Sequence, residues 1–150
     1  MYLKEFLKKY EDPIELYVDM DGVIADYVIG KPCDFDKKRP LYTSIKKLEE
    51  ISKMGNVNMN ILSITRKTIG RTEKNVWLDK YAPFFKKENR NIISKEENPN
   101  ISSANLKLNF LKNVNNDKII ILIDDDPIIL KTIEKELKNV VLLKDTVLVD

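Results

Sequence analysis

Strands and helices alternate along this chain, and this alternation constrains the fold more than any other feature. Apolar runs predict strands at residues 14–18, 57–63, 91–94, 118–123 and 140–143. Apolar residues at helical spacing predict helices at residues 2–10, 43–54, 71–81 and 127–138, with another from Ser102 or Ser103 to about residue 113. Residues 22–40, with Gly30, Pro32 and Pro40, are expected to be irregular. This order predicts an α/β fold.

The predicted strands are apolar on both faces. The run at residues 118–123 is almost entirely Ile and Leu. Such strands are typical of a parallel sheet that is covered by helices on both sides. We therefore predict a three-layer, Rossmann-like fold with a central parallel sheet, formed by residues 1–150 as a single domain. Ligands of such folds bind at the carboxyl ends of the strands.

Two absences exclude whole classes of chemistry. The chain has no histidine, which excludes Ser-His-Asp triads and zinc sites with histidine ligands. Its one cysteine, Cys33, to which we assign no role, excludes disulfides within the chain and suits a reducing compartment. No apolar run is long enough to span a membrane, and the start of the chain does not resemble a secretory signal. We expect a cytoplasmic protein. Its net charge of +2 argues neither for nor against nucleic-acid binding, and no stable nucleic-acid binding is evident from the sequence.

Acidic residues stand at the ends of two predicted strands. Asp19 and Asp21 follow the first strand, and Asp124 and Asp125 end the strand at residues 118–123. Because parallel strands end at the same edge of a sheet, these carboxylates are expected to lie close together. Their mutual repulsion calls for a hard divalent cation with oxygen ligands, and we predict Mg²⁺.

The strand ends together resemble the motifs of the haloacid dehalogenase (HAD) superfamily of phosphohydrolases. The segment YVDMDGVIADY resembles its first motif, ILSIT its second, and ILIDDDP its fourth; Lys107 fits the third, a lone lysine before the last acidic strand. The motifs occur in the family's order and span nearly the whole chain. The IDD sequence and the Trp77-Leu78 helix are most similar to the deoxyribonucleotidase and polynucleotide-phosphatase branches.

The resemblance implies a Mg²⁺-dependent phosphatase that acts through an aspartyl-phosphate. Asp19 would be the nucleophile, and Asp21 would be the general acid and base. Ser63 would bind a phosphoryl oxygen, and Lys107 would offset the charge on the phosphoryl group. Metal ligands would be Asp19, the backbone carbonyl of Asp21, Asp124 and Asp125, with the side chain of Asp21 turned away from the metal.

Several positions have alternatives. Thr65 could replace Ser63 as the phosphate-binding residue, and Lys95 could replace Lys107. Arg66, Lys67 and Arg71 could bind further phosphates of the substrate or form a solvated basic loop. Asp126, before Pro127, is expected to cap a helix rather than bind metal. Trp77, at helical spacing from Tyr81, is expected to be a core residue.

The family resemblance also limits the substrate. Many members of the superfamily have a cap domain that closes over small substrates, and here the stretches in which a cap would be inserted leave room for little or none. An open site favours a phosphate on a nucleic-acid end or a protein, with a free nucleotide as the next candidate. A non-catalytic module that binds Mg²⁺ or a phosphorylated partner, and a phosphotransferase, are the alternative functions.

Overall fold

The computed structural model describes residues 2–27, 35–114 and 117–149, so Cys33 lies outside the described residues. It has a five-stranded sheet in the order β3-β2-β1-β4-β5. All of its strand pairs are parallel. The strands are β1 (Ile14–Val18), β2 (Val57–Thr65), β3 (Arg90–Ser94), β4 (Ile119–Asp124) and β5 (Val140–Lys144). The predicted α/β fold with a central parallel sheet is confirmed.

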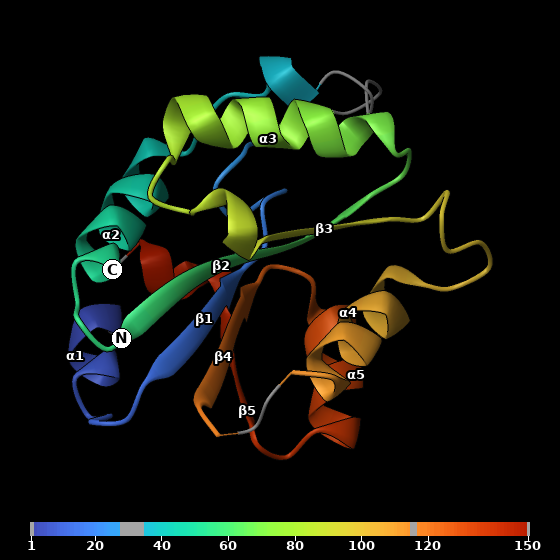
Figure 1. Cartoon of the computed structure of the whole chain (residues 1–150). Coiled ribbons are helices and arrows are strands. Elements are labelled where there is room, and N and C mark those ends of the chain that lie inside the picture. Colours follow the sequence, from blue (N-terminus) through green and yellow to red (C-terminus); the bar gives the residue numbers. More distant parts are fainter. Residues whose placement is uncertain (1, 28–34, 115–116, 150) are drawn as a thin grey trace.

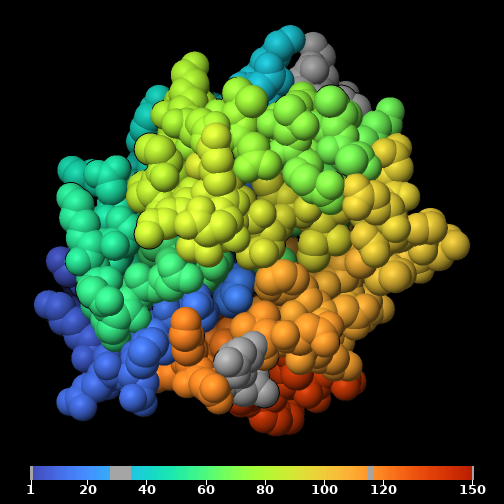
Figure 2. All heavy atoms as spheres, viewed as in Figure 1, coloured from blue at the N-terminus to red at the C-terminus, as the bar shows by residue number. Residues whose placement is uncertain are grey.

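Helices cover both faces of the sheet (Figure 1). The α-helices are α1 (Leu3–Leu7), α2 (Tyr42–Ser52), α3 (Ile69–Tyr81), α4 (Ser103–Lys112) and α5 (Pro127–Glu136). Short 3₁₀ helices are η1 (Phe35–Lys37), η2 (Lys87–Asn89) and η3 (Asp145–Leu148). Figure 2, from the same side, shows that side chains fill the spaces between these ribbons.

The alternation of side chains along each strand divides the apolar core in two. In β1, Leu16 and Val18 pack with the buried residues of α1, α2 and α3. Tyr17, between them, points to the opposite face and packs with the buried residues of α4 and α5. Because successive side chains of a strand point to opposite faces, both faces of the sheet must be covered, as the apolar strands predict.

Two helices begin at the caps that the sequence predicts. The Ser102 side chain accepts a hydrogen bond of 3.1 Å from the amide of Asn105, at the start of α4. The Asp126 side chain accepts one of 2.8 Å from the amide of Ile128, and Pro127 opens α5. These contacts satisfy amides that a helix start otherwise leaves without a partner. The Asp126 side chain thus caps α5, as expected.

Some predicted boundaries were wrong. Helix α1 ends at Leu7, whereas the sequence predicts a helix over residues 2–10. Strand β2 runs two residues beyond Ser63, because Ile64 pairs with Ile93 and Thr65 with Ser94 of β3. Within the described ranges, no helix combines the length and the apolar character that crossing a membrane requires.

Candidate active site

Asp19 and Asp124 lie side by side at the carboxyl edge of the sheet. Strands β1 and β4 are neighbours in parallel register, with Val18 opposite Ile123. The amide of Asp19 donates a hydrogen bond of 3.0 Å to the carbonyl of Ile123, so its backbone is still held by the sheet. Both carboxylates are buried. The sheet therefore brings the two predicted acidic positions together, on the face that α4 covers.

A buried lysine of α4 bridges these two carboxylates. The Lys107 Nζ atom donates hydrogen bonds to Asp19 Oδ1 at 2.9 Å and to Asp124 Oδ2 at 2.6 Å. Burial lowers the pKa of Lys107, but the two carboxylates more than offset this, and the pKa lies above its ordinary value. Lys107 is therefore a cation. Lys95, the alternative from the sequence, is exposed instead.

Three carboxylates form a cluster that could hold a metal ion. One oxygen each from Asp19, Asp124 and Asp125 lies within 4.8 Å of the others. Burial raises the pKa of Asp19 to about 6, although Lys107 acts in the opposite direction. Burial also raises the pKa of Asp124 and of Asp125. One lysine does not balance three carboxylates, and an all-oxygen donor set suits a hard cation.

Asp125 has a further partner in Tyr27. The hydroxyl of Tyr27 donates a hydrogen bond of 2.7 Å to Asp125 Oδ2. Asp125 directly follows β4, and Gly22 lies against its carboxylate with a φ of 77°. A side chain at residue 22 would overlap with the carboxylate and with the Tyr27 ring. Glycine at this turn thus gives both the backbone conformation and the space that the acidic cluster needs.

The side chain of Asp21 is not part of the three-carboxylate cluster. It forms ion pairs with Lys38 and, at 3.1 Å, with Lys74. Burial raises the pKa of Asp21, but these two lysines outweigh burial and lower it below the ordinary value. No observation tests the expectation that the backbone carbonyl of Asp21 binds metal, which stays a prediction.

Lys38 and Lys74 contact Asp21, and neither was predicted from the sequence to lie near it. Lys74 is buried on the face of α3 that also buries Gly70, Trp77 and Leu78. Its Nζ atom donates to Ser63 Oγ at 2.7 Å as well as to Asp21. A lysine at helical spacing within an apolar stripe was the available signal for Lys74. No comparable pattern in the sequence marks Lys38.

Ser63 and Thr65, the two candidates for phosphate binding in the second predicted motif, form hydrogen bonds with residues other than Asp19. Ser63 is fully buried and bonded to Lys74. Thr65 is also buried, and its hydroxyl donates to the carbonyl of Lys67 at 3.2 Å. Arg66 is exposed. The nearby Arg71 is paired with Glu97 at 3.0 Å, so it is engaged within the fold.

Two adjoining cavities lie at this edge of the sheet. One, of about 140 Å³, is lined by residues that include Asp19, Asp21, Lys107, Asp124 and Asp125. We call it the acidic cavity. Tyr27, which follows β1, and Ile64 of β2 also line it, whereas Ser63 of β2 does not.

The other cavity, of about 260 Å³, shares Asp21, Tyr27 and Ile64 with the acidic cavity. Its lining also includes Lys38, Arg66 and Lys74, and we call it the basic cavity. A larger cavity, of about 530 Å³, lies at Tyr42 and Val149 and is lined by none of the described carboxylates. The carboxylates and lysines line the two adjoining cavities and not this larger one.

Comparison with known proteins shows that the fold of this chain is similar to that of part of a solved structure. No protein-family model and no curated protein matches the chain. One solved chain, from a structure described as "Structure of the Pnkp1/Rnl/Hen1 RNA repair complex", superposes with a TM-score of 0.67 and 15% sequence identity. The match covers 88% of this chain and 42% of that one. The chain thus has the fold of about two fifths of a component of an RNA repair complex.

Proposed function

We propose that this protein is a Mg²⁺-dependent phosphomonoester hydrolase with Asp19 as its nucleophile. The observation that carries the proposal is the group formed by Asp19, Asp124, Asp125 and Lys107 at the carboxyl edge of the sheet. In the proposed reaction it would supply a nucleophile, a cation and an oxygen donor set from one buried to half-buried cluster. Its residues also lie in the segments that resemble the first, third and fourth motifs of the HAD superfamily.

The first step would be an attack by a carboxylate oxygen of Asp19 on the phosphorus of the substrate. A bond forms between that oxygen and phosphorus, and the bond from phosphorus to the leaving oxygen breaks. The leaving oxygen takes a proton from the carboxyl group of Asp21. Lys74 and Lys38 favour the ionised form of Asp21, and the negative charge of an incoming phosphate shifts it towards the protonated form.

The second step would hydrolyse the aspartyl-phosphate. Asp21, now a carboxylate, takes a proton from a water molecule, whose oxygen bonds to phosphorus. The bond from phosphorus to the Asp19 oxygen breaks, and inorganic phosphate leaves. Lys107, 2.9 Å from Asp19 Oδ1, would offset negative charge in both steps. The assignment of Ser63 to a phosphoryl oxygen stays a prediction, because Ser63 does not line the acidic cavity.

Asp19, Asp124 and Asp125 would hold the Mg²⁺ ion, together with the backbone carbonyl of Asp21. Bound there, the ion would reduce the repulsion between the Asp19 carboxylate and the phosphate. The donor set fits this cation, because it consists of oxygens and has more negative charge than Lys107 neutralises.

For the substrate, we propose a phosphorylated nucleic-acid end or nucleotide. The fold similarity to a component of an RNA repair complex supports this class, and the acidic cavity opens beside a basic one. A phosphorylated protein is the alternative substrate, and a panel of nucleotides, phosphorylated DNA and RNA ends and phosphopeptides would separate these classes.

The first test is hydrolysis of a generic aryl phosphate with and without Mg²⁺. We expect turnover that depends on Mg²⁺ and is lost in Asp19→Asn. Asp26→Asn is the matched control, because Asp26 follows the same strand but pairs with Arg39 at 2.9 Å. Equal turnover in wild type and Asp19→Asn would contradict the proposal, as would a folded wild type that hydrolyses no phosphate of the substrate panel.

A further inference from the structure

The basic cavity has more positive charge than its one carboxylate can neutralise. Lys38 and Lys74 are 8% and 3% exposed, and both pair with Asp21. Arg66 adds a third, exposed cation to the lining. Burying an ammonium group is costly unless it has a partner of opposite charge. Two cations for one carboxylate leave a site that favours a further anion.

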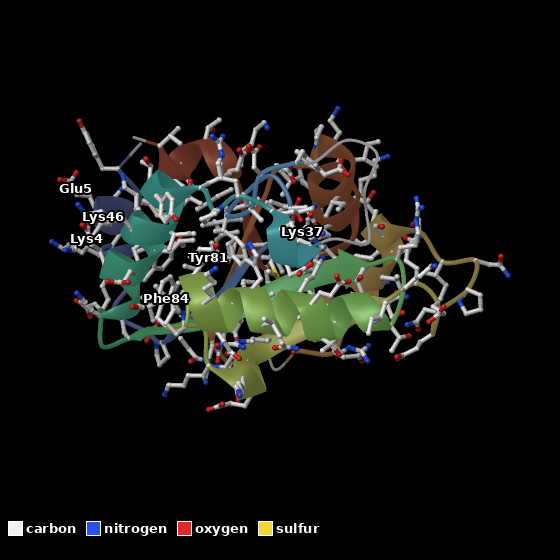
Figure 3. The ribbon with its side chains drawn as sticks, turned by 90° about the horizontal axis from the view of Figure 1, so that it is seen from above. Lys4, Glu5, Lys37, Lys46, Tyr81 and Phe84 are labelled. Atoms are coloured by element: carbon white, nitrogen blue, oxygen red, sulfur yellow. The ribbon has the colours of Figure 1, made fainter. Side chains whose placement is uncertain are left out.

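The two lysines are held in place by aromatic side chains. Their Nζ atoms lie 4.8 Å (Lys38) and 5.0 Å (Lys74) from the centroid of the Phe35 ring. Phe35 in turn packs edge-on against Trp77, with 5.8 Å between ring centroids, and the indole of Trp77 donates to the Lys38 carbonyl at 2.9 Å. Figure 3 shows η1, which carries Lys37, beside α3. The cations are therefore arranged before any ligand arrives.

The position of the basic cavity relative to Asp21 indicates which part of a substrate would reach it. Asp21 lines both cavities, and the nucleophile Asp19 lines only the acidic one. In the proposed reaction, Asp21 protonates the leaving oxygen. The leaving group must then lie on the Asp21 side of the phosphate, where the basic cavity begins.

We propose that the basic cavity binds a second phosphate, carried by the leaving group of the substrate. This inference rests on the proposed function and deepens it. The substrate class is a phosphorylated sugar whose other hydroxyl also carries a phosphate, as in a nucleoside 3′,5′-bisphosphate or the terminal nucleotide of a phosphorylated nucleic acid. Lysine and arginine are the side chains that bind phosphate through charge-assisted hydrogen bonds.

The test measures binding separately from turnover. Calorimetry on Asp19→Asn compares adenosine 3′,5′-bisphosphate with adenosine 3′- and 5′-monophosphate in the presence of Mg²⁺. We expect the bisphosphate to bind about tenfold more tightly or better, since a second charged contact is gained. A dinucleotide with one terminal phosphate shows whether a phosphodiester can replace the second phosphate.

Arg66→Gln in the same background should remove most of that difference, because Arg66 is the cation of the cavity that is not paired with Asp21. Lys67→Gln is the matched control, since Lys67 is an exposed neighbour that does not line the cavity. In the active enzyme, Arg66→Gln should raise KM for the bisphosphate by a larger factor than it raises KM for the monophosphates.

The outcomes separate the two proposals. Equal affinity for mono- and bisphosphates, or an equal loss for both in Arg66→Gln, would overturn the second-phosphate site even if the enzyme is active. Tighter binding of the bisphosphate without turnover of any phosphate would overturn the phosphatase and leave the anion site standing. If the dinucleotide binds as tightly as the bisphosphate, the ligand is a nucleic-acid end; if the bisphosphate alone gains affinity, it is a free nucleotide.

Discussion

Asp19→Asn should make the protein more stable as well as inactive. Asp19 is buried, and burial raises the pKa of its carboxyl group from an ordinary 3.8 to about 6, with Lys107 acting in the opposite direction. The folded state therefore holds the proton more tightly than the unfolded state does. It follows that the charged form of Asp19 is a cost to the fold, and asparagine has nearly the same shape without the charge.

The size of the stability gain in Asp19→Asn, and the pH range in which it occurs, follow from the pKa of Asp19. Because the folded pKa is raised, the stability of the wild type falls as the pH rises from about 3.8 to about 6, and the full cost is present above that range. The difference between the two pKa values corresponds to about 3 kcal/mol at neutral pH. This is an upper bound, because side chains and water rearrange around a buried charge. We expect a gain of about 1–3 kcal/mol at about pH 7.5 and almost none at about pH 4.

The assay is urea unfolding of wild type, Asp19→Asn and the control Asp26→Asn, in chelator and at both pH values. Added Mg²⁺ should then stabilise the wild type more than Asp19→Asn, because binding to the folded state stabilises it by mass action. If Asp19→Asn is less stable than the wild type at about pH 7.5 in chelator, the charge of Asp19 supports the fold and the reasoning is wrong. Asp26→Asn should change stability by less than about 1 kcal/mol, as expected for an exposed ion pair.

Three further predictions concern other groups. Lys107→Met leaves the neighbouring buried carboxylates without their cation and should lower the free energy of unfolding by about 3–5 kcal/mol in chelator and by less in Mg²⁺. Equal losses of stability in both conditions would contradict a metal at this cluster. Gly22→Ala should lower the free energy of unfolding by about 1–2 kcal/mol from its φ of 77° alone. It should also weaken Mg²⁺ binding measured by calorimetry, because the added Cβ overlaps with Asp125 Oδ2. Unchanged Mg²⁺ affinity would exclude Asp125 as a ligand. Burial raises the pKa of Glu15, but hydrogen bonds from two asparagines and Lys118 outweigh burial and lower the pKa below 4.5. The stability that Glu15 contributes is therefore present above about pH 4.5 and lost as the pH falls further. Urea unfolding should show a steeper loss of stability in acid for the wild type than for Glu15→Gln, and parallel curves would refute this.

The sequence by itself determined the α/β fold and the placement of Asp19 and Asp124 at one edge of the sheet, whereas the pairing of β1 with β4 made them neighbours. Apolar strands that alternate with helices require a sheet covered on both faces, and parallel strands end at one edge. Residues at the ends of β1 and β4 therefore lie at that edge, whichever order the strands take. The helix caps at Ser102 and Asp126 were also predictable, because they depend on contacts two or three residues apart.

Tertiary structure decided which face and which partner each side chain has. Whether Ser63 faces Asp19 depends on the register of β1 against β2, since a side chain one position along a strand points to the opposite face. In this register Ser63 lies against Lys74 of α3. Lys107 is bonded to Asp19 because α4 covers the other face.

The basic cavity was likewise beyond prediction from the sequence alone. Lys38 and Lys74 are 36 positions apart in a chain with 26 lysines and arginines, and most such side chains are solvated. They meet at Asp21 because η1 packs on α3 through Phe35 and Trp77. Packing between elements that are distant in sequence determines this contact, and no local periodicity of the sequence predicts it.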